Sequence, residues 1–212
     1  DSGSTKTTWC FLDTESGSRE IRQTPGINPF YQGEEEIIAM LEKELPPLNR
    51  DSDYLFFYGA GCANPAVNEV VYHALGSFFQ TPVIDVQSDM MAAARSLCGR
   101  EAGIACILGT GSTSCYYDGT SIAGNVSPMG FVLGDEGSGG VLGKRLLADV
   151  LKNQLPGSVI SRFFASGITR GEIMENIYRK PFPNRYAAQF TRFIFENREE
   201  PAIKALVIKE FD

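Results

Sequence analysis

The sequence predicts an α/β protein of two lobes, residues 1–100 and 101–212, and three observations lead to this prediction. Apolar runs of strand length alternate with segments of helical periodicity through the first part of the chain. Two turns rich in glycine, serine and threonine, one starting at Asp1 and the other at Leu108, each open a β-hairpin. After Ser138 the pattern is almost wholly helical.

The first lobe is expected to alternate strands and helices. Strands are expected at residues 7–12, 19–23, 54–58 and 81–86, of which 54–58 is expected to be buried. Helices are expected at residues 34–45, 65–79 and 90–97. Asn64 is the expected cap of the second helix and Pro65 its first residue, because proline already has a helical φ and lacks an N–H that would go unpaired there.

The second lobe is expected to begin with a strand near Gly103, a hairpin, and a short strand around residues 121–125. Helices follow, broken at Pro156-Gly157 and at residues 181–183. No strand is expected after Val126, so this lobe would lack part of its sheet.

Composition narrows the class of protein. The chain is 43% hydrophobic and 21% charged, which is typical of a globular protein, and no apolar run has the length of a membrane helix. Its net charge of -7 argues against nucleic acid binding, which needs a basic face. A single histidine, His73, makes a zinc site improbable and a structural role the better interpretation.

The cysteines are odd in number, spread along the chain and mostly within apolar runs. This pattern favours reduced, buried thiols in a cytoplasmic protein rather than a disulfide framework. They are Cys10, Cys62, Cys98, Cys106 and Cys115.

The two glycine-rich turns are candidate phosphate-binding elements. A turn of small residues whose backbone N–H groups and hydroxyls point outward makes an anion nest. One such turn is also ordinary loop punctuation. Two of them, each set between strand-like runs, favour a nucleotide whose phosphate chain is held from both sides.

Four segments carry a resemblance to a known family. DSGSTKT at residues 1–7, Asp89 after a strand, LGTGSTS at residues 108–114 and LGDEGSGG at residues 133–140 resemble the phosphate-1, connect-1, phosphate-2 and sugar-loop segments of N-acetylglucosamine kinases. Those kinases belong to the actin-like ATPase superfamily of sugar kinases, heat-shock ATPases and actin. The chain is similar to a bacterial family that also includes activator ATPases of 2-hydroxyacyl-CoA dehydratases and benzoyl-CoA reductases.

The resemblance runs from Asp1 to about Asn197, and its specific part is LGTGS followed by GDEGSG. It implies a two-lobed, ribonuclease H-like fold. The family continues into further strands and a glycine-rich adenosine-binding segment, and it has a strand before the first turn. We therefore expect the chain to be incomplete, with an incomplete second lobe and no assignable adenine contacts.

The resemblance implies ATP and Mg²⁺ as cofactors. Asp1, at the mouth of the first turn, suits a hydrated Mg²⁺, although it also fits a surface acid at the chain start. The expected phosphate-binding residues supply N–H groups, hydroxyls and one cation. They are Gly3, Ser4, Thr5 and Lys6 in the first turn, and Gly109, Thr110, Gly111, Ser112 and Thr113 in the second.

Asp89 is the expected general base, because it follows a strand and starts a helix, at the sheet edge where open α/β sheets bind ligands. Aspartate is also a preferred helix N-cap, so the same position has a purely structural interpretation. A carboxylate that accepts N–H bonds has its pKa lowered, so capping and base catalysis compete.

The LGDEGSGG segment has two interpretations as well. Gly134 and Gly137 permit tight turns and Ser138 can cap the next helix, which together describe a well-capped helix start. In the resembling kinases this loop lines the sugar pocket. The substrate-binding residues that the resemblance implies are Asn28, Gly130, Asp135 and Glu136.

The leading hypothesis is an ATP-dependent kinase of an amino sugar, N-acetylglucosamine above all, that forms the 6-phosphate and acts as a homodimer. One alternative is an activator ATPase that couples hydrolysis to electron transfer through an iron–sulfur cluster. Cys62 and Cys98 lie close to expected helix starts or ends, but neither sits in a recognisable cluster motif, so this alternative ranks well below the kinase. Another is a sugar-sensing regulator without catalytic activity. Membrane partners are not expected.

Overall fold

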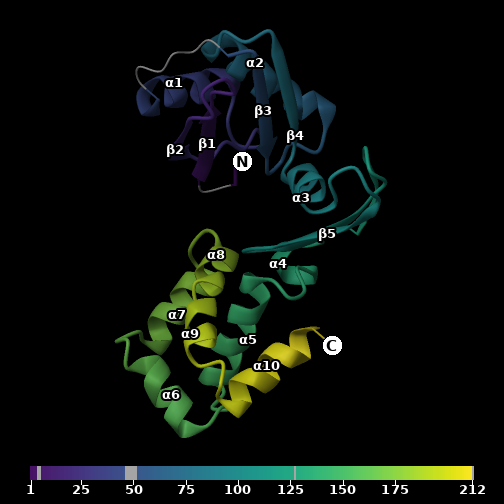
Figure 1. The fold of residues 1–212 in the computed structure, drawn as a ribbon. Coiled ribbons are helices and arrows are strands. Elements are labelled where there is room, and N and C mark those ends of the chain that lie inside the picture. Colours follow the sequence, from purple (N-terminus) through teal and green to yellow (C-terminus); the bar gives the residue numbers. More distant parts are fainter. Residues whose placement is uncertain (4–5, 46–51, 127, 212) are drawn as a thin grey trace. The chain divides into compact units, whose positions relative to one another are not determined.

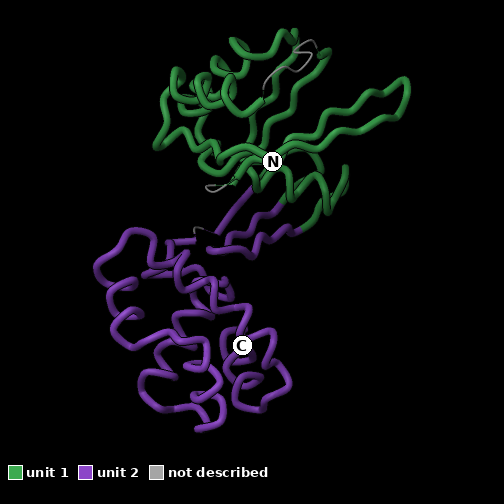
Figure 2. The backbone as a smooth tube through the Cα atoms, turned by 90° about the vertical axis from the view of Figure 1, so that its left-hand side faces the viewer, with its two compact units in different colours: residues 1–103, 117–122 green, residues 104–116, 123–212 purple. Residues whose placement is uncertain are grey.

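The computed structural model of the chain describes residues 1–3, 6–45, 52–126 and 128–211. It divides into two compact units, which Figure 2 shows in separate colours. Unit 1 consists of residues 1–103 and 117–122, and unit 2 of residues 104–116 and 123–212. The mixture of helices and small sheets is the α/β class that the sequence predicts.

Unit 1 contains two strand pairs. The strands are β1 (Lys6–Leu12), β2 (Arg19–Pro25), β3 (Tyr54–Gly59) and β4 (Val83–Ser88). β1 and β2 are antiparallel, whereas β3 and β4 are parallel. Ser2 joins the two pairs, because its N–H donates to the Tyr58 carbonyl at 2.8 Å and its carbonyl accepts from the Ala60 N–H at 2.8 Å.

The helices of unit 1 are α1 (Glu34–Glu44), α2 (Pro65–Phe78) and α3 (Asp89–Cys98). Helices α1 and α2 lie side by side, and α2 also packs on β4 (Figure 1). Asn64 caps α2 through an Ala66 N–H bond to its side chain, with Pro65 at the first position, as the sequence predicts. Burying large side chains such as Phe57 and Phe78 stabilises the unit by about 1.5–3 kcal/mol each.

Strand β3 is buried on one face only. Leu55 and Phe57 are buried, but Tyr54 is 65% and Phe56 59% exposed. The prediction of a buried strand at residues 54–58 is therefore wrong for Tyr54 and Phe56. Its continuous aromatic and apolar run concealed the alternation that a half-covered strand usually shows.

Three strands and seven helices follow in the described part of the chain. β5 (Gly103–Leu108), β6 (Ser112–Tyr117) and β7 (Ile122–Val126) form one sheet in that order. The helices are α4 (Gly130–Leu133), α5 (Gly139–Leu151), α6 (Gly157–Phe164), α7 (Arg170–Tyr178), α8 (Pro183–Ala188), α9 (Thr191–Glu196) and α10 (Pro201–Phe211). No strand follows Val126 among the described residues, as predicted.

Helix α5 is the centre of the helical part of unit 2, and it contacts α8, α9 and α10 (Figure 1). Gly143 permits the close packing of α5 on α8, because a Cβ at Gly143 would lie 1.9 Å from the Ala187 carbonyl oxygen. The core around it includes Leu146, Val150 and Phe163, all nearly inaccessible to solvent.

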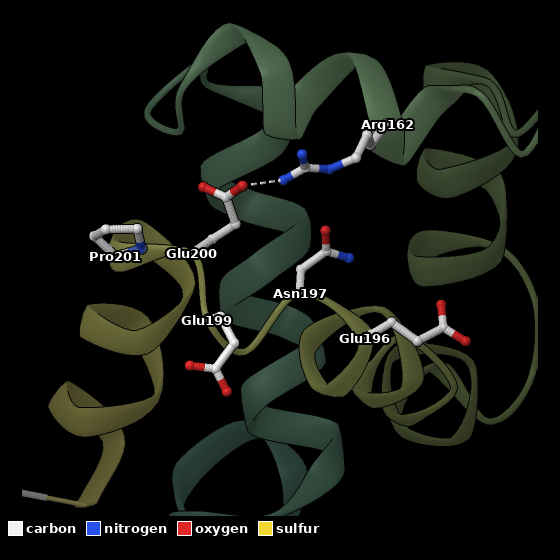
Figure 3. A pocket seen from close by; sticks show the side chains of 6 residues that line it. All are labelled: Arg162, Glu196, Asn197, Glu199, Glu200 and Pro201. Atoms are coloured by element: carbon white, nitrogen blue, oxygen red, sulfur yellow. Dashed lines mark hydrogen bonds and ion pairs between the residues drawn. The ribbon is translucent and has the colours of Figure 1, made fainter.

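A polar hollow of about 430 Å³ lies between α6 and the α9–α10 segment (Figure 3). Arg162 reaches across it to Glu200 at 2.7 Å. Its other lining residues are Glu196, Asn197, Glu199 and Pro201. None of the site residues predicted from the sequence line this hollow.

None of the five cysteines, all of which lie among the described residues, forms a disulfide bond, but their burial differs from the prediction. Cys62 and Cys115 are buried, whereas Cys10 and Cys106 are exposed. Both exposed cysteines lie on strands, where side chains alternate between faces, so an apolar run alone does not decide their burial. Among the described residues no helix has the length and apolarity needed to cross a membrane.

Candidate functional site

Asp89 is the first residue of α3 and is not its cap. The N-cap is Ser88, whose side-chain oxygen accepts a hydrogen bond from the Met91 N–H at 3.2 Å. Asp89 accepts one bond, from the Met90 N–H at 2.8 Å. Burial raises the pKa of the Asp89 carboxyl, and backbone hydrogen bonds oppose this shift. Asp89 is therefore not the N-cap residue of α3, although its carboxylate pairs with one N–H of the first turn.

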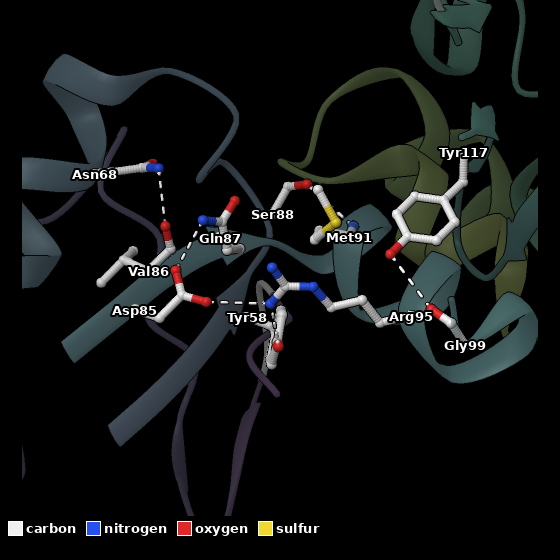
Figure 4. A network of polar contacts seen from close by, with 10 residues as sticks. All are labelled: Tyr58, Asn68, Asp85, Val86, Gln87, Ser88, Met91, Arg95, Gly99 and Tyr117. Carbon is white, nitrogen blue, oxygen red and sulfur yellow. Dashed lines mark hydrogen bonds and ion pairs between the residues drawn. The ribbon is translucent and has the colours of Figure 1, made fainter. Parts of the chain in front are cut away.

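A polar network fixes the helix that carries Asp89 (Figure 4). The Arg95 guanidinium on α3 donates to the Tyr58 hydroxyl of β3 at 2.7 Å and to the Asp85 carboxylate of β4 at 3.1 Å. Gln87 donates to the other Asp85 oxygen at 2.8 Å. The ion pair is partly exposed and contributes roughly 1 kcal/mol or less, so its main effect is to orient α3 on the two strands.

The turn that follows β3 lies next to Asp89. Cys62, in this turn, is buried, and its N–H donates to the Gly59 carbonyl at 3.1 Å. Burial and, second, the nearby Asp89 carboxylate raise the pKa of the Cys62 thiol to about 11. Gly59 pairs with Ser88 in the parallel β3–β4 register, so the turn and Asp89 both lie at the carboxyl ends of these two strands.

The same turn contacts Asn28. Gly61 has φ +86°, and a Cβ there would lie 2.7 Å from the Asn28 side-chain oxygen and 2.9 Å from the Phe30 ring. Only glycine fits both the backbone angle and this close approach. The Asn28 oxygen also accepts from the Phe30 N–H at 3.0 Å. Asn28 and Asp89 thus flank one turn at one end of the sheet.

The turn after β3 is not among the functional elements predicted from the sequence. It reads Gly59-Ala60-Gly61-Cys62 and begins at Gly59, the last residue of β3. A third glycine-rich turn at the carboxyl end of a strand was the signal that could have identified it.

The first glycine turn is attached to the loop that carries Asn28. Ser2 is fully buried, and its hydroxyl contacts the Thr7 hydroxyl at 2.7 Å and both backbone groups of Ile27 at 3.0 Å. The Gly3 N–H donates to the Lys6 carbonyl at 3.0 Å, which closes the turn. Asp1, Gly3 and Lys6 are exposed, and the predicted residues Ser4 and Thr5 lie outside the described residues.

The second glycine turn is held by the start of α5. The Gly139 N–H donates to the Gly109 carbonyl at 2.8 Å, and the Gly140 N–H to the Thr110 carbonyl at 3.0 Å. In a trans peptide the carbonyl and the next N–H point in opposite directions. The N–H groups of Thr110 and Gly111 therefore point away from α5, and neither donates a hydrogen bond within the described part of the chain.

Asp135 lies against this turn. It is 7% exposed and has φ +63°, a left-handed conformation that is uncommon for aspartate. Its carboxylate accepts from the Ser112 N–H at 3.4 Å, and a Cβ on Gly111 would lie 2.9 Å from it. The structure thus joins one predicted sugar-binding residue to the predicted phosphate turn.

The remaining predicted residues of unit 2 lie near these groups in the chain. Gly130 begins α4 with φ +77°, Glu136 is exposed next to Asp135, and Thr113 is half-buried on β6. Ser138 is fully buried and caps α5 by accepting from the Val141 N–H at 3.2 Å, which confirms the predicted helix start.

The structure thus gathers the predicted residues into two groups, one in each unit. Asp89 and Asn28 meet at the β3 turn, with the first glycine turn attached to the Asn28 loop. The second glycine turn and Asp135 meet at the start of α5. Each group combines carboxylate or amide side chains with a turn of small residues, which is the chemistry needed to orient hydroxyls and anions.

Comparison with solved structures identifies relatives of the chain. The structure of a "putative N-acetylglucosamine kinase" from Porphyromonas gingivalis is 45% identical, with a TM-score of 0.90 over 99% of this chain and 76% of that one. A protein of the same description from Chromobacterium violaceum is 20% identical, with a TM-score of 0.65 over 97% and 75% of the two chains, and shows the fold alone. No protein-family model matches the sequence, and no curated protein matches it significantly.

Proposed function

Because the chain belongs to the same family as the N-acetylglucosamine kinase-like protein of P. gingivalis, we propose that it transfers a phosphoryl group from ATP to the 6-hydroxyl of N-acetylglucosamine. The 45% identity over nearly the whole chain is the observation that carries this proposal. We also propose that the chain has the fold of a two-lobed actin-like ATPase, with lobes at residues 1–100 and 101–212.

Asp89 is the general base in this proposal. It accepts the proton of the sugar hydroxyl while the new oxygen–phosphorus bond forms and the bond to the leaving ADP breaks. Two observations support it: Ser88 performs the capping, and burial raises the Asp89 pKa. A raised pKa makes a carboxylate a stronger base, provided that it stays ionised at the working pH.

We assign the binding of the ATP phosphates to the residues of the two glycine turns. The Thr110 and Gly111 N–H groups are donors for the phosphates, with Gly109, Ser112 and Thr113 beside them. Gly3, Ser4, Thr5 and Lys6 complete the set. Asp1 is exposed at the first turn, and its hard carboxylate oxygen fits a hydrated Mg²⁺, whose charge would neutralise the phosphates.

The sugar is assigned to Asn28, Gly130, Asp135 and Glu136, together with Asp89. The closeness of Asn28 to the β3 turn beside Asp89 supports this assignment, because the reacting hydroxyl must lie within reach of the base. The buried Asp135 carboxylate and the half-buried Asn28 amide favour a polyol, because a hydroxyl can pair with them and an apolar ligand cannot.

The activator ATPase is the second candidate, and it has less support. Cys62 is buried and its thiol pKa is raised to about 11, so burial disfavours the thiolate form of Cys62 when no metal is bound. The homodimer stays a prediction.

Release of ADP tests the proposal. The full-length protein with Mg²⁺ is expected to release ADP faster when N-acetylglucosamine is added, weakly with glucose, and only slowly without sugar. Product analysis should find the sugar 6-phosphate in equal amount to ADP. Absence of stimulation by any hexose or amino sugar would contradict the kinase, and sugar-independent hydrolysis with bound iron would favour the activator.

A further inference from the structure

We propose that Asp135, which we assign to the sugar, also weakens nucleotide binding at the second glycine turn, and that it thereby couples the binding of the two. Its carboxylate lies where the second glycine turn would receive a phosphate, so the protein binds nucleotide weakly until a sugar hydroxyl engages this carboxylate. This inference rests on the proposed function and concerns groups of unit 2 alone.

First, the Asp135 carboxylate contacts the second glycine turn directly. One oxygen of Asp135 accepts from the Ser112 N–H at 3.4 Å, and the carboxylate also packs against Gly111. Ser112 directly follows the two residues whose N–H groups point away from α5. The carboxylate therefore takes one donor of the anion nest. Its N···O distance is longer than the usual 2.7–3.2 Å, so this bond is weak and can be exchanged for another.

The second step is that the position of the carboxylate is fixed. The Asp135 N–H donates to the Pro128 carbonyl at 2.9 Å, and its carbonyl accepts from the Ser138 N–H at 3.0 Å. Ser138 in turn caps α5, whose next two residues hold the glycine turn. One continuous segment thus holds both the carboxylate and the turn, and neither can move far without breaking these bonds.

The third step is electrostatic. A carboxylate that is 7% exposed is poorly screened by water, so it repels a phosphate at the same turn. Sugar hydroxyls that donate to the carboxylate disperse its charge and compete for the oxygen that faces Ser112. Sugar binding should therefore raise nucleotide affinity, and by reciprocity nucleotide should raise sugar affinity by the same factor.

The test is Asp135→Asn, measured by calorimetric titration of the full-length protein with ADP and Mg²⁺ in the absence of sugar. Asparagine tolerates the left-handed conformation and keeps an oxygen for the Ser112 N–H, so the variant should fold. We expect ADP to bind roughly tenfold more tightly, within the usual range of coupling between sites. Added N-acetylglucosamine should tighten ADP binding in the wild type but hardly at all in the variant.

Asp149→Asn is the matched control, because it removes a carboxylate from α5 itself, beyond the turn, and should leave ADP affinity unchanged. Equal or weaker ADP binding by Asp135→Asn would overturn the inference, and weaker binding would indicate that Asp135 holds the metal. If Asp135→Asn tightens ADP binding as expected but the wild type phosphorylates no sugar, the proposed function fails while the assignment of Asp135 to the phosphate turn stands.

Discussion

Replacing Asp89 with asparagine separates catalysis from helix capping, because the cap of α3 is the adjacent residue, Ser88. The asparagine amide cannot accept the proton of the sugar hydroxyl. Losing a general base lowers kcat by roughly 10² to 10⁴, which corresponds to about 2.7–5.4 kcal/mol in the activation barrier. Binding of ADP and sugar should change by a few fold at most.

The stability of Asp89→Asn follows from the direction of the pKa shift. Burial raises the Asp89 pKa, so the folded state disfavours the ionised form. This cost in stability is present above the raised pKa and disappears below the unfolded-state pKa. Asparagine removes the cost at neutral pH, but it also removes a charge near the helix N-terminus that is worth about 0.3–1 kcal/mol. The free energy of unfolding should therefore stay within about 1 kcal/mol of wild type.

Ser88→Ala is the matched variant. It removes the cap and should lower the free energy of unfolding by about 1 kcal/mol, while kcat stays within a few fold of wild type. The two variants are compared by coupled ADP-release kinetics and by urea denaturation. The pH profile adds a third measurement. As the pH is lowered, the wild-type kcat/KM should decline with an apparent pKa above the ordinary aspartate value, because burial raises the Asp89 pKa.

Near-normal turnover of Asp89→Asn would contradict a role of Asp89 as general base. A loss in the free energy of unfolding equal to that of Ser88→Ala would contradict the assignment of the cap to Ser88 alone. Either result would return Asp89 to a structural role at the start of α3.

Two further predictions concern packing and thiol reactivity. Gly143→Ala should lower the free energy of unfolding by about 3 kcal/mol, because the added Cβ would lie 1.9 Å from a backbone carbonyl oxygen of α8. Gly157→Ala is the control: its Cβ would enter open space, so it should leave the free energy of unfolding unchanged in the same denaturation assay. An equal loss in both variants would contradict this packing. At about pH 7.5, buried Cys62 should react with iodoacetamide far more slowly than exposed Cys106, because burial raises the pKa of the Cys62 thiol to about 11. The two labelling rates can be compared by mass spectrometry. Equal labelling rates would show that the β3 turn opens readily.

Local signals in the sequence predicted much of the fold. Asn64 followed by Pro65 identified the start of α2, and Ser138 before a run of small residues identified the start of α5. These signals work because a cap needs only the residues within one turn of it. The predicted kinship is supported at the level of a shared family with the P. gingivalis protein, which is described as a "putative N-acetylglucosamine kinase", whereas the actin-like superfamily stays a prediction.

Features that depend on distant contacts could not be predicted. Ser88 and Asp89 are both good capping residues, and the sequence does not reveal which one takes the extended backbone of the cap. The contact of Asp135 with Ser112 joins residues 23 positions apart, so no local pattern indicates it. The uncovered face of β3 likewise depends on which helices pack against the sheet, and its aromatic run gives no sign of this.

The way α5 holds the second glycine turn changes how an anion can bind there. A helix N-terminus normally offers its own free N–H groups to a phosphate. Here the Gly139 and Gly140 N–H groups are committed to the carbonyls of Gly109 and Thr110, and Ser138 satisfies the next one. Carbonyl oxygens would repel a phosphate, so fixing them against the helix leaves the N–H groups of the turn as the available donors. A Cβ on Gly140 would lie 2.7 Å from the Thr110 oxygen, so the glycine run is required for this close docking. The glycines after Ser138 therefore allow the second glycine turn to dock on the start of α5, and this explains why helix-breaking residues open the central helix of unit 2.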